Sequence, residues 1–125
     1  MVDRFTILLG RMPRMLHEIL LHVLGERQDV ELVETVGGAN LAAAAERTAP
    51  SVIAVGRPDS DPISAGSILA ASPSSRFVEL SAEGRSAVLY AAGSAPRTLE
   101  GLAPSALFDL ILSDTRREVR RKAVH

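Results

Sequence analysis

Cysteine and tryptophan are both absent from the 125 residues, and the aromatic side chains are limited to three Phe and one Tyr. Without cysteine the chain can form no disulfide, no thiolate metal site and no cysteine nucleophile. So few aromatic rings leave almost no surface on which the bases of single-stranded nucleic acid could stack. Any functional site in this protein must therefore be built from oxygen and nitrogen groups.

Long hydrophobic runs are also missing. No stretch approaches the roughly 20 apolar residues that a membrane span requires, and the N-terminal segment shows no apolar run of signal-peptide length. The formal net charge is −1, so no overall field favours nucleic acid, an anionic membrane or an acidic substrate. We therefore expect a cytoplasmic protein that makes no membrane contact.

What is present is typical of one folded domain, with 46% hydrophobic and 23% charged residues. We place this domain at residues 1–114. Residues 115–125 form a basic segment with five Arg or Lys and one Glu. Such a segment either extends the last helix into solvent or contacts an acidic partner or nucleic acid through phosphate-type contacts. The first interpretation is the commoner one, and nucleic acid is not an expected partner.

Apolar runs and helical patterns alternate along the first two thirds of the chain. Strands are predicted at Phe5–Leu9, Val30–Val36, Ser51–Val55 and Arg76–Leu80, and helices at Arg14–Gly25, Leu41–Ala49 and Ile63–Ala71. This alternation implies right-handed crossovers and a mainly parallel sheet with helices on both faces. The expected fold class is a three-layer α/β sandwich.

The alternation stops after Leu80. Six residues separate it from the next apolar run, Ala87–Ala91, which is too few for a parallel crossover. The Glu83-Gly84 step within this linker favours a hairpin. We therefore expect a β-hairpin in place of a fourth helix, then a short edge strand near Arg97, and a last helix from Pro104 to about Asp114.

Four segments of the chain, residues 6–13, 50–56, 76–82 and 103–111, resemble in order and spacing the receiver domain of two-component response regulators. Pro13 stands where that family often begins its first helix, and Pro50 precedes the third strand as it typically does there. Ser81-Ala82 matches the small hydroxyl residue and alanine that end the fourth strand. The resemblance implies a flavodoxin-like, receiver-like fold.

The departures from that family fall on its chemical residues. Gly10 and Arg11 replace the Mg²⁺-binding acids, and Gly56 replaces the phosphorylated aspartate. The fifth strand runs into Gly93 near the place of the family's lysine, and only Ser81 remains. Phosphoryl transfer to a carboxylate needs that carboxylate and a cation held by hard oxygen ligands. We therefore expect a degenerate phosphoacceptor pocket, with no catalytic residue, no cofactor and no enzymatic activity.

Arg11, Arg57 and Ser81 follow parallel strands and are expected at one edge of the sheet. Two guanidinium groups and a hydroxyl there could bind a phosphate or a carboxylate. The alternative is that the arginines pair with Asp59 and Asp61 in the neighbouring loop and close the vacated pocket. The second arrangement is the one we favour.

Other polar groups give weaker signals, and no metal site is expected. Asp59 and Asp61 lie two apart in a proline-bounded loop without a third ligand at fixed spacing, so they are expected to be solvated turn residues. His17 and His22 are five apart on a helix, which does not align them on one face. Gly37-Gly38 lacks the dinucleotide-binding glycine pattern.

The function that we expect is that of a phosphorylation-independent, receiver-like regulatory domain acting through protein–protein interaction or dimerisation. The expected interface is apolar and comprises Leu89, Tyr90, Phe108, Leu110 and Leu112. Exposed apolar patches often bind partners, so this patch could bind a regulatory protein. If the patch is self-complementary, it favours a two-fold dimer. The alternative is a small-molecule or anion-binding domain that uses Arg11, Arg57 and Ser81.

Overall fold

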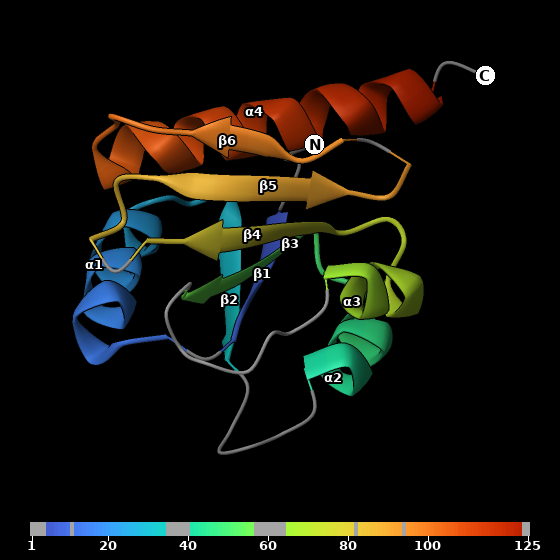
Figure 1. The fold of residues 1–125 in the computed structure, drawn as a ribbon, viewed down its shortest axis with the longest axis horizontal. Helices are drawn as coiled ribbons and strands as arrows, with labels where there is room; N and C mark the ends of the chain where they lie inside the picture. Colours follow the sequence, from blue (N-terminus) through green and yellow to red (C-terminus); the bar gives the residue numbers. More distant parts are fainter. Residues whose placement is uncertain are drawn as a thin grey trace.

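The protein is described here by a computed structural model, which covers residues 5–10, 12–34, 41–56, 65–81, 83–93 and 95–123. The strands are β1 (Phe5–Leu9), β2 (Val30–Glu34), β3 (Val52–Gly56), β4 (Arg76–Leu80), β5 (Ala87–Ala91) and β6 (Arg97–Leu99). The helices are α1 (Arg14–Gly25), α2 (Leu41–Thr48), α3 (Ala65–Ala71) and α4 (Pro104–Ala123). Together they form an α/β structure in which helices lie on both faces of one sheet (Figure 1).

The sheet has six strands in the order β2-β1-β3-β4-β5-β6. The first four in this order are parallel, whereas β5 is antiparallel to β4 and β6 is antiparallel to β5. The predicted α/β class and the predicted hairpin between β4 and β5 are therefore confirmed. The sheet is mixed, because the linker after β4 is too short to return the chain for parallel pairing.

The apolar pattern of helix α4 stops near Asp114, but its backbone stays helical to Ala123. This agrees with the interpretation of the basic segment as an extension of the last helix. No glycine or proline follows Pro104 to end it. The basic segment therefore begins as a continuation of α4. No helix within the described ranges is both long enough and apolar enough to cross a membrane.

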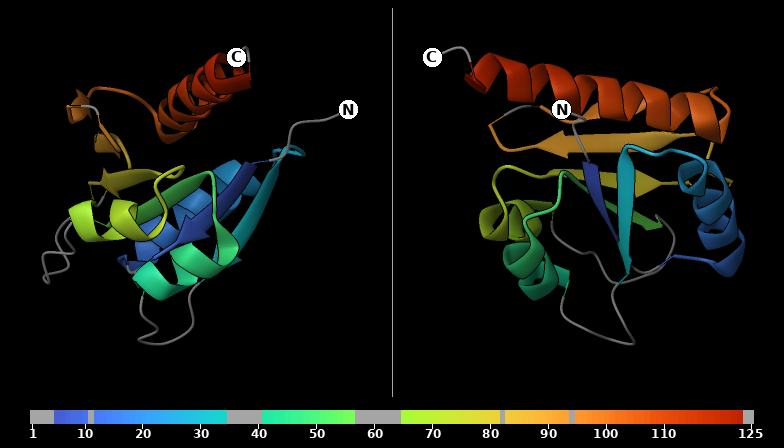
Figure 2. Two further views of the ribbon diagram at one scale, coloured as in Figure 1. Left: turned by 90° about the vertical axis from the view of Figure 1, so that its right-hand side faces the viewer. Right: turned by 180° about the vertical axis from the view of Figure 1, so that it is seen from behind.

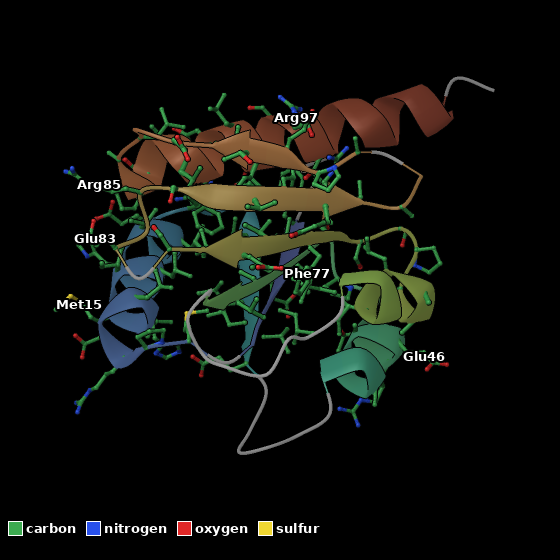
Figure 3. The ribbon with its side chains drawn as sticks, in the orientation of Figure 1. Met15, Glu46, Phe77, Glu83, Arg85 and Arg97 are labelled. Atoms are coloured by element: carbon green, nitrogen blue, oxygen red, sulfur yellow. The ribbon has the colours of Figure 1, made fainter. Side chains whose placement is uncertain are left out.

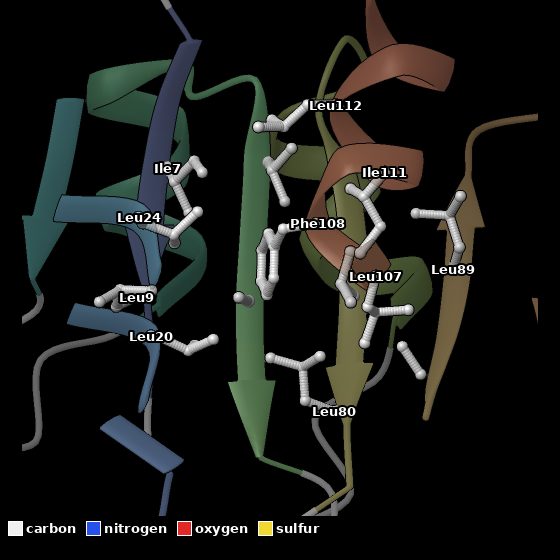
Figure 4. Close-up of a cluster of buried hydrophobic side chains, with 14 of the residues drawn as sticks. Ile7, Leu9, Leu20, Leu24, Leu80, Leu89, Leu107, Phe108, Ile111 and Leu112 are labelled. Carbon is white, nitrogen blue, oxygen red and sulfur yellow. The ribbon is translucent and has the colours of Figure 1, made fainter. Parts of the chain in front are cut away.

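The larger apolar core lies between the sheet and the helices α1 and α4 (Figure 4). Alternate strand residues point toward this side, as the pleat requires, and α4 contributes apolar residues at helical spacing. Its labelled members are Ile7, Leu9, Leu20, Leu24, Leu80, Leu89, Leu107, Phe108, Ile111 and Leu112. This core joins strands from both the parallel and the antiparallel parts of the sheet.

The opposite face of the sheet packs against α2 and α3 (Figure 2). Its buried residues are Leu8, Ala44, Ala45, Ile53, Val55, Ile68 and Phe77. The two alanines of α2 have small side chains, which lets this helix approach the strands closely. Phe77 and Tyr90 form a tilted aromatic pair across β4 and β5, with ring centroids 5.9 Å apart.

Burial overturns most of the predicted interface. Phe108 is 0% exposed, Leu112 2% and Leu89 3%, so all three are core residues and cannot form an apolar surface patch. The apolar residues of α4 cover a wide part of its surface because this helix packs across several strands at once. Tyr90 is half-buried, and Leu110 is exposed. The expectation of an apolar patch made by these five residues is therefore wrong.

The hairpin between β4 and β5 is held against α1 and the start of α4. Gly84 has a φ of +72°, which an L side chain rarely adopts, and a Cβ there would lie 3.3 Å from Leu16 Cδ1 and 3.5 Å from Pro104 Cγ. A glycine is needed at this position both for the turn and for the contact. The hairpin is thus fixed to the helical layer that covers the larger core.

Two groups of ion pairs connect α4 to the rest of the fold. Arg27 pairs with Asp29 and with Asp109 of α4. Burial lowers the pKa of the Arg27 guanidinium, but its hydrogen bonds to both carboxylates outweigh burial and raise that pKa above its ordinary value. A guanidinium is charged at every accessible pH in both the folded and unfolded states, so the ionisation of Arg27 itself adds no pH dependence to stability.

The second group lies near the far end of the hairpin. The Arg76 guanidinium, whose side chain is 9% exposed, donates to Asp114 Oδ2 of α4 at 2.5 Å. Arg97 Nη1 lies 3.4 Å from the other oxygen of Asp114 and is mostly exposed. Because a buried charge needs a partner, the Arg76–Asp114 pair fixes where α4 crosses β4.

Replacing the charge of Asp114 is expected to weaken this attachment. Asp114→Asn should lower the free energy of unfolding by about 2 kcal/mol, because a charge-assisted bond to a buried guanidinium is lost. Arg97→Ala, at the exposed end of the same group, should change it by less than about 0.5 kcal/mol. Urea titration of both variants checks this, and equal effects would contradict the assignment of the main contact to Arg76.

Two glycines with the same backbone angle offer a matched test of the hairpin contact. Gly84 and Gly101 both have a φ of +72°, but a Cβ at Gly101 would meet nothing within 4 Å. Each substitution by alanine should cost about 1 kcal/mol through backbone strain. Gly84→Ala should lose more, since Leu16 and Pro104 must also move, and thermal unfolding curves of the two variants measure the difference.

Candidate functional site at the carboxyl ends of the parallel strands

The carboxyl ends of β1, β3 and β4 lie at one edge of the sheet, where open α/β folds commonly place their ligand sites. The register pairs Leu9 with Ala54 and Gly56 with Leu80, so Gly10, Gly56 and Ser81 all reach this edge. The N–H of Gly10 donates to the carbonyl oxygen of Ala54 at 2.8 Å. The sequence prediction that Gly10, Gly56 and Ser81 follow adjacent strands at the same edge agrees with this arrangement.

Gly56 is buried, and the turn between β1 and α1 closes over it. A Cβ at this position would lie 2.7 Å from Pro13 Cδ and 2.9 Å from Met12 Cβ. Both distances are shorter than real Cβ contacts, so any side chain would force the turn to shift. The space that a functional side chain at position 56 would occupy is filled by Met12 and Pro13.

Ser81 takes part in the hairpin turn. Its hydroxyl oxygen accepts a hydrogen bond from the N–H of Ser86 at 3.2 Å, and its own N–H donates to the carbonyl oxygen of Ser86 at 2.9 Å. The carbonyl oxygen of Ser81 also accepts from the N–H of Gly84 at 2.9 Å. These bonds give Ser81 a structural role that the sequence pattern did not indicate.

The other members of the predicted anion pocket lie outside the described residues. Arg11 and Arg57 belong to this group, as do Asp59 and Asp61, with which we expected the arginines to pair. The anion pocket and its alternative therefore both stay predictions. Among the described residues, no three His, Asp or Glu side chains are grouped so that they could hold a metal ion.

A histidine–carboxylate pair near this edge was missed by the sequence analysis. His17, in the second turn of α1, has its Nε2 against Glu34 Oε1 at the carboxyl end of β2. Both side chains are partly exposed, at 35% and 49%. The sequence order could have indicated this pair, because α1 connects β1 to β2 and the polar side of α1 faces the end of β2. His22 instead pairs along its own helix with Glu26, at 3.7 Å.

Comparison of the chain with protein-family models, with curated proteins and with solved structures gives no match. The chemistry of this edge must therefore be argued from its own side chains. Two polar groups in the described part of the edge are the Ser81 hydroxyl and the His17–Glu34 pair. Ser81 is bonded within its turn and His17 to Glu34, and no hydrogen bond between these two sets is present there. Among the described residues, no histidine or carboxylate is hydrogen-bonded to the Ser81 hydroxyl, as a base that activates it would be.

The closure over Gly56 predicts a large cost for adding even one methyl group. Gly56→Ala should lower the free energy of unfolding by about 2 kcal/mol, because Met12 and Pro13 must be displaced. Gly25→Ala is the matched control, since a Cβ there meets nothing within 4 Å. It should leave stability unchanged or raise it slightly, as alanine favours the helix.

Guanidinium chloride unfolding followed by circular dichroism measures both variants. If Gly56→Ala were as stable as the parent protein, the turn would be free to move and the edge would not be closed in the way described.

Proposed function

We propose that this chain is a degenerate, receiver-like regulatory domain that works without phosphorylation and acts by binding protein partners. The observation that carries the proposal is the closure over Gly56 by Met12 and Pro13. The resemblance to receiver domains implies a phosphoacceptor at this position. Glycine offers no nucleophile there, and the surrounding turn leaves no space for one.

The topology supports the likeness in its parallel half and departs from it in the other half. The order β2-β1-β3-β4, with helices on both faces, suits a flavodoxin-like arrangement. The reversed β5 and the hairpin that precedes it replace a strand and a helix of that arrangement. We therefore propose that the fold derives from the receiver type, with one helix of its signalling side lost.

The surroundings of Ser81 support a function without catalysis. The hydroxyl is used by the hairpin turn, and no base or acid contacts it among the described residues. Phosphoryl transfer also needs oxygen ligands for a divalent cation, and Gly10 provides no side chain for this. These features support the proposal of a cytoplasmic interaction domain with no cofactor.

The surface that we propose for partner binding is the side of β4, β5 and β6 that faces away from α4. We call it the open sheet face and define it by Glu79, Val88, Tyr90 and Thr98, which lie on neighbouring strands in register. None of the helices that the structure describes lies in front of β5 or β6 on this side (Figure 1). Of the predicted interface, Tyr90 belongs to this face, and α3 packs near it.

The proposal is tested by treating the purified chain with acetyl phosphate and Mg²⁺. We expect no acid-labile phosphoryl group by intact-mass spectrometry and no change in the amide NMR spectrum, because no carboxylate nucleophile occupies the end of β3. Ser81→Ala is the control that separates an acid-stable serine ester from an acyl phosphate. Detection of an acyl phosphate on any aspartate of the chain would overturn the proposal.

A further inference from the structure

The open sheet face carries a carboxylate, Glu79, that has no basic partner among the residues that the structure describes. Glu79 is half-buried on β4, and its lateral neighbours in the sheet are Val55 on β3 and Val88 on β5. Within the described residues it forms no ion pair or hydrogen bond. The aromatic pair of Phe77 and Tyr90 lies next to it on the same face. A carboxylate among apolar neighbours favours a partner that brings a cation.

This charge also restricts how two copies of the chain could meet. If two open sheet faces packed directly on each other about a two-fold axis, both Glu79 carboxylates would enter one small interface. Like charges at an interface oppose association. The occupant of this face must therefore present basic groups, which the face itself does not supply.

The chain has such a basic element at the end of α4. Residues 115–125 hold five of the 14 Arg and Lys and one of the 15 Asp and Glu, so the remaining 114 residues hold nine basic and fourteen acidic residues. The body of the domain is thus acidic and the end of α4 is basic. Four arginines, Arg116, Arg117, Arg120 and Arg121, recur at the spacing of one helical turn.

The position of α4 determines whether the basic segment can reach the open sheet face of the same chain. Thr115 of α4 is buried, and the helix continues for eight residues, or about 12 Å, beyond it. Figures 1 and 2 show this end projecting past the strands. Because α4 covers the side of the sheet opposite to Glu79, the segment lies on the wrong side to reach its own Glu79.

We propose that the basic end of α4, residues 116–123, docks on the open sheet face of a second copy of the chain, over Glu79. Each copy has one basic segment and one acidic face. If the basic segment of each copy contacts the acidic face of the other, both contacts form and the result is a closed two-fold dimer. This inference rests on the proposed function as an interaction domain and names its partner as a second copy.

The test is sedimentation velocity of the full chain over a wide range of concentrations. We expect a dimer at low salt that weakens as salt is raised, because the contact depends on charge. Glu79→Arg should weaken dimerisation roughly tenfold or more. Glu46→Arg is the matched control, because Glu46 is an exposed acid on α2, away from the face (Figure 3), and it should leave the dimer unchanged.

A charge exchange separates direct docking from a general effect on folding. One variant has Glu79→Arg; the other has Arg116→Glu, Arg117→Glu, Arg120→Glu and Arg121→Glu. Each alone should be monomeric, since its face and its basic or acidic segment then repel in a dimer of identical chains. An equimolar mixture should form a heterodimer, because both contacts are again between opposite charges.

Three results would overturn the docking: a monomeric parent chain at millimolar concentration and low salt, a dimer that tolerates both charge changes, or a mixture that stays monomeric while both variants keep their circular dichroism spectra. None of these results bears on the acetyl phosphate experiment. Failure of the docking and failure of the proposed function are therefore distinguishable.

Discussion

The packing of helix α4 across the sheet is the constraint on which most of this structure depends. Its buried residues contact strands from both the parallel and antiparallel parts, so one helix joins the two halves into a single core. At one end the contact of Pro104 with the hairpin at Gly84 places the helix, and at the other end Asp114 pairs with Arg76. The hydrophobic area that α4 removes from water is the main source of this attachment.

The position of α4 explains why the sheet is covered unequally. On its side, alternate residues of β4 and β5 are buried, while on the opposite side Val88 and Tyr90 are only half-buried and Thr98 is exposed. Antiparallel strands tolerate such one-sided burial, because their alternating residues can face water on one side. In the parallel half, β1 and β3 are covered on both faces, since each crossover contributes a helix. The open sheet face is thus a consequence of replacing a crossover by a hairpin.

A short connection also explains why Met12 and Pro13 cover the end of β3. The turn from β1 to α1 is short, and Pro13 starts the helix immediately after it, so Met12 and Pro13 are drawn over the end of β3. Only glycine at position 56 permits this approach. At the end of β3 this closure leaves no space for a side chain at position 56, and the function that we propose therefore relies on the surfaces of the domain. The uneven charge, acidic in the body and basic at the end of α4, then becomes relevant to what it binds.

The secondary structure of the first two thirds, the hairpin after Leu80 and the α/β class followed from the sequence, because hydrophobic periodicity and linker length act locally. The apolar pattern of α4 stops at the limit of the core, and its continuation was predicted only as one of two interpretations of the basic segment. The roles of Phe108 and Leu112 could not be assigned either. Their spacing predicts an apolar stripe on the helix, but not whether the sheet of the same chain or a partner covers it.

For the candidate site, the residue types at the strand ends were decided by the sequence, and with them the missing nucleophile at Gly56. Only the tertiary structure decided that Met12 and Pro13 fill the space, that Ser81 bonds within its turn, and that His17 meets Glu34. The physical reason is that residue identity and local periodicity depend on near neighbours along the chain. Contacts between distant segments depend on how α4 and α1 dock on the sheet, which the sequence pattern does not encode position by position.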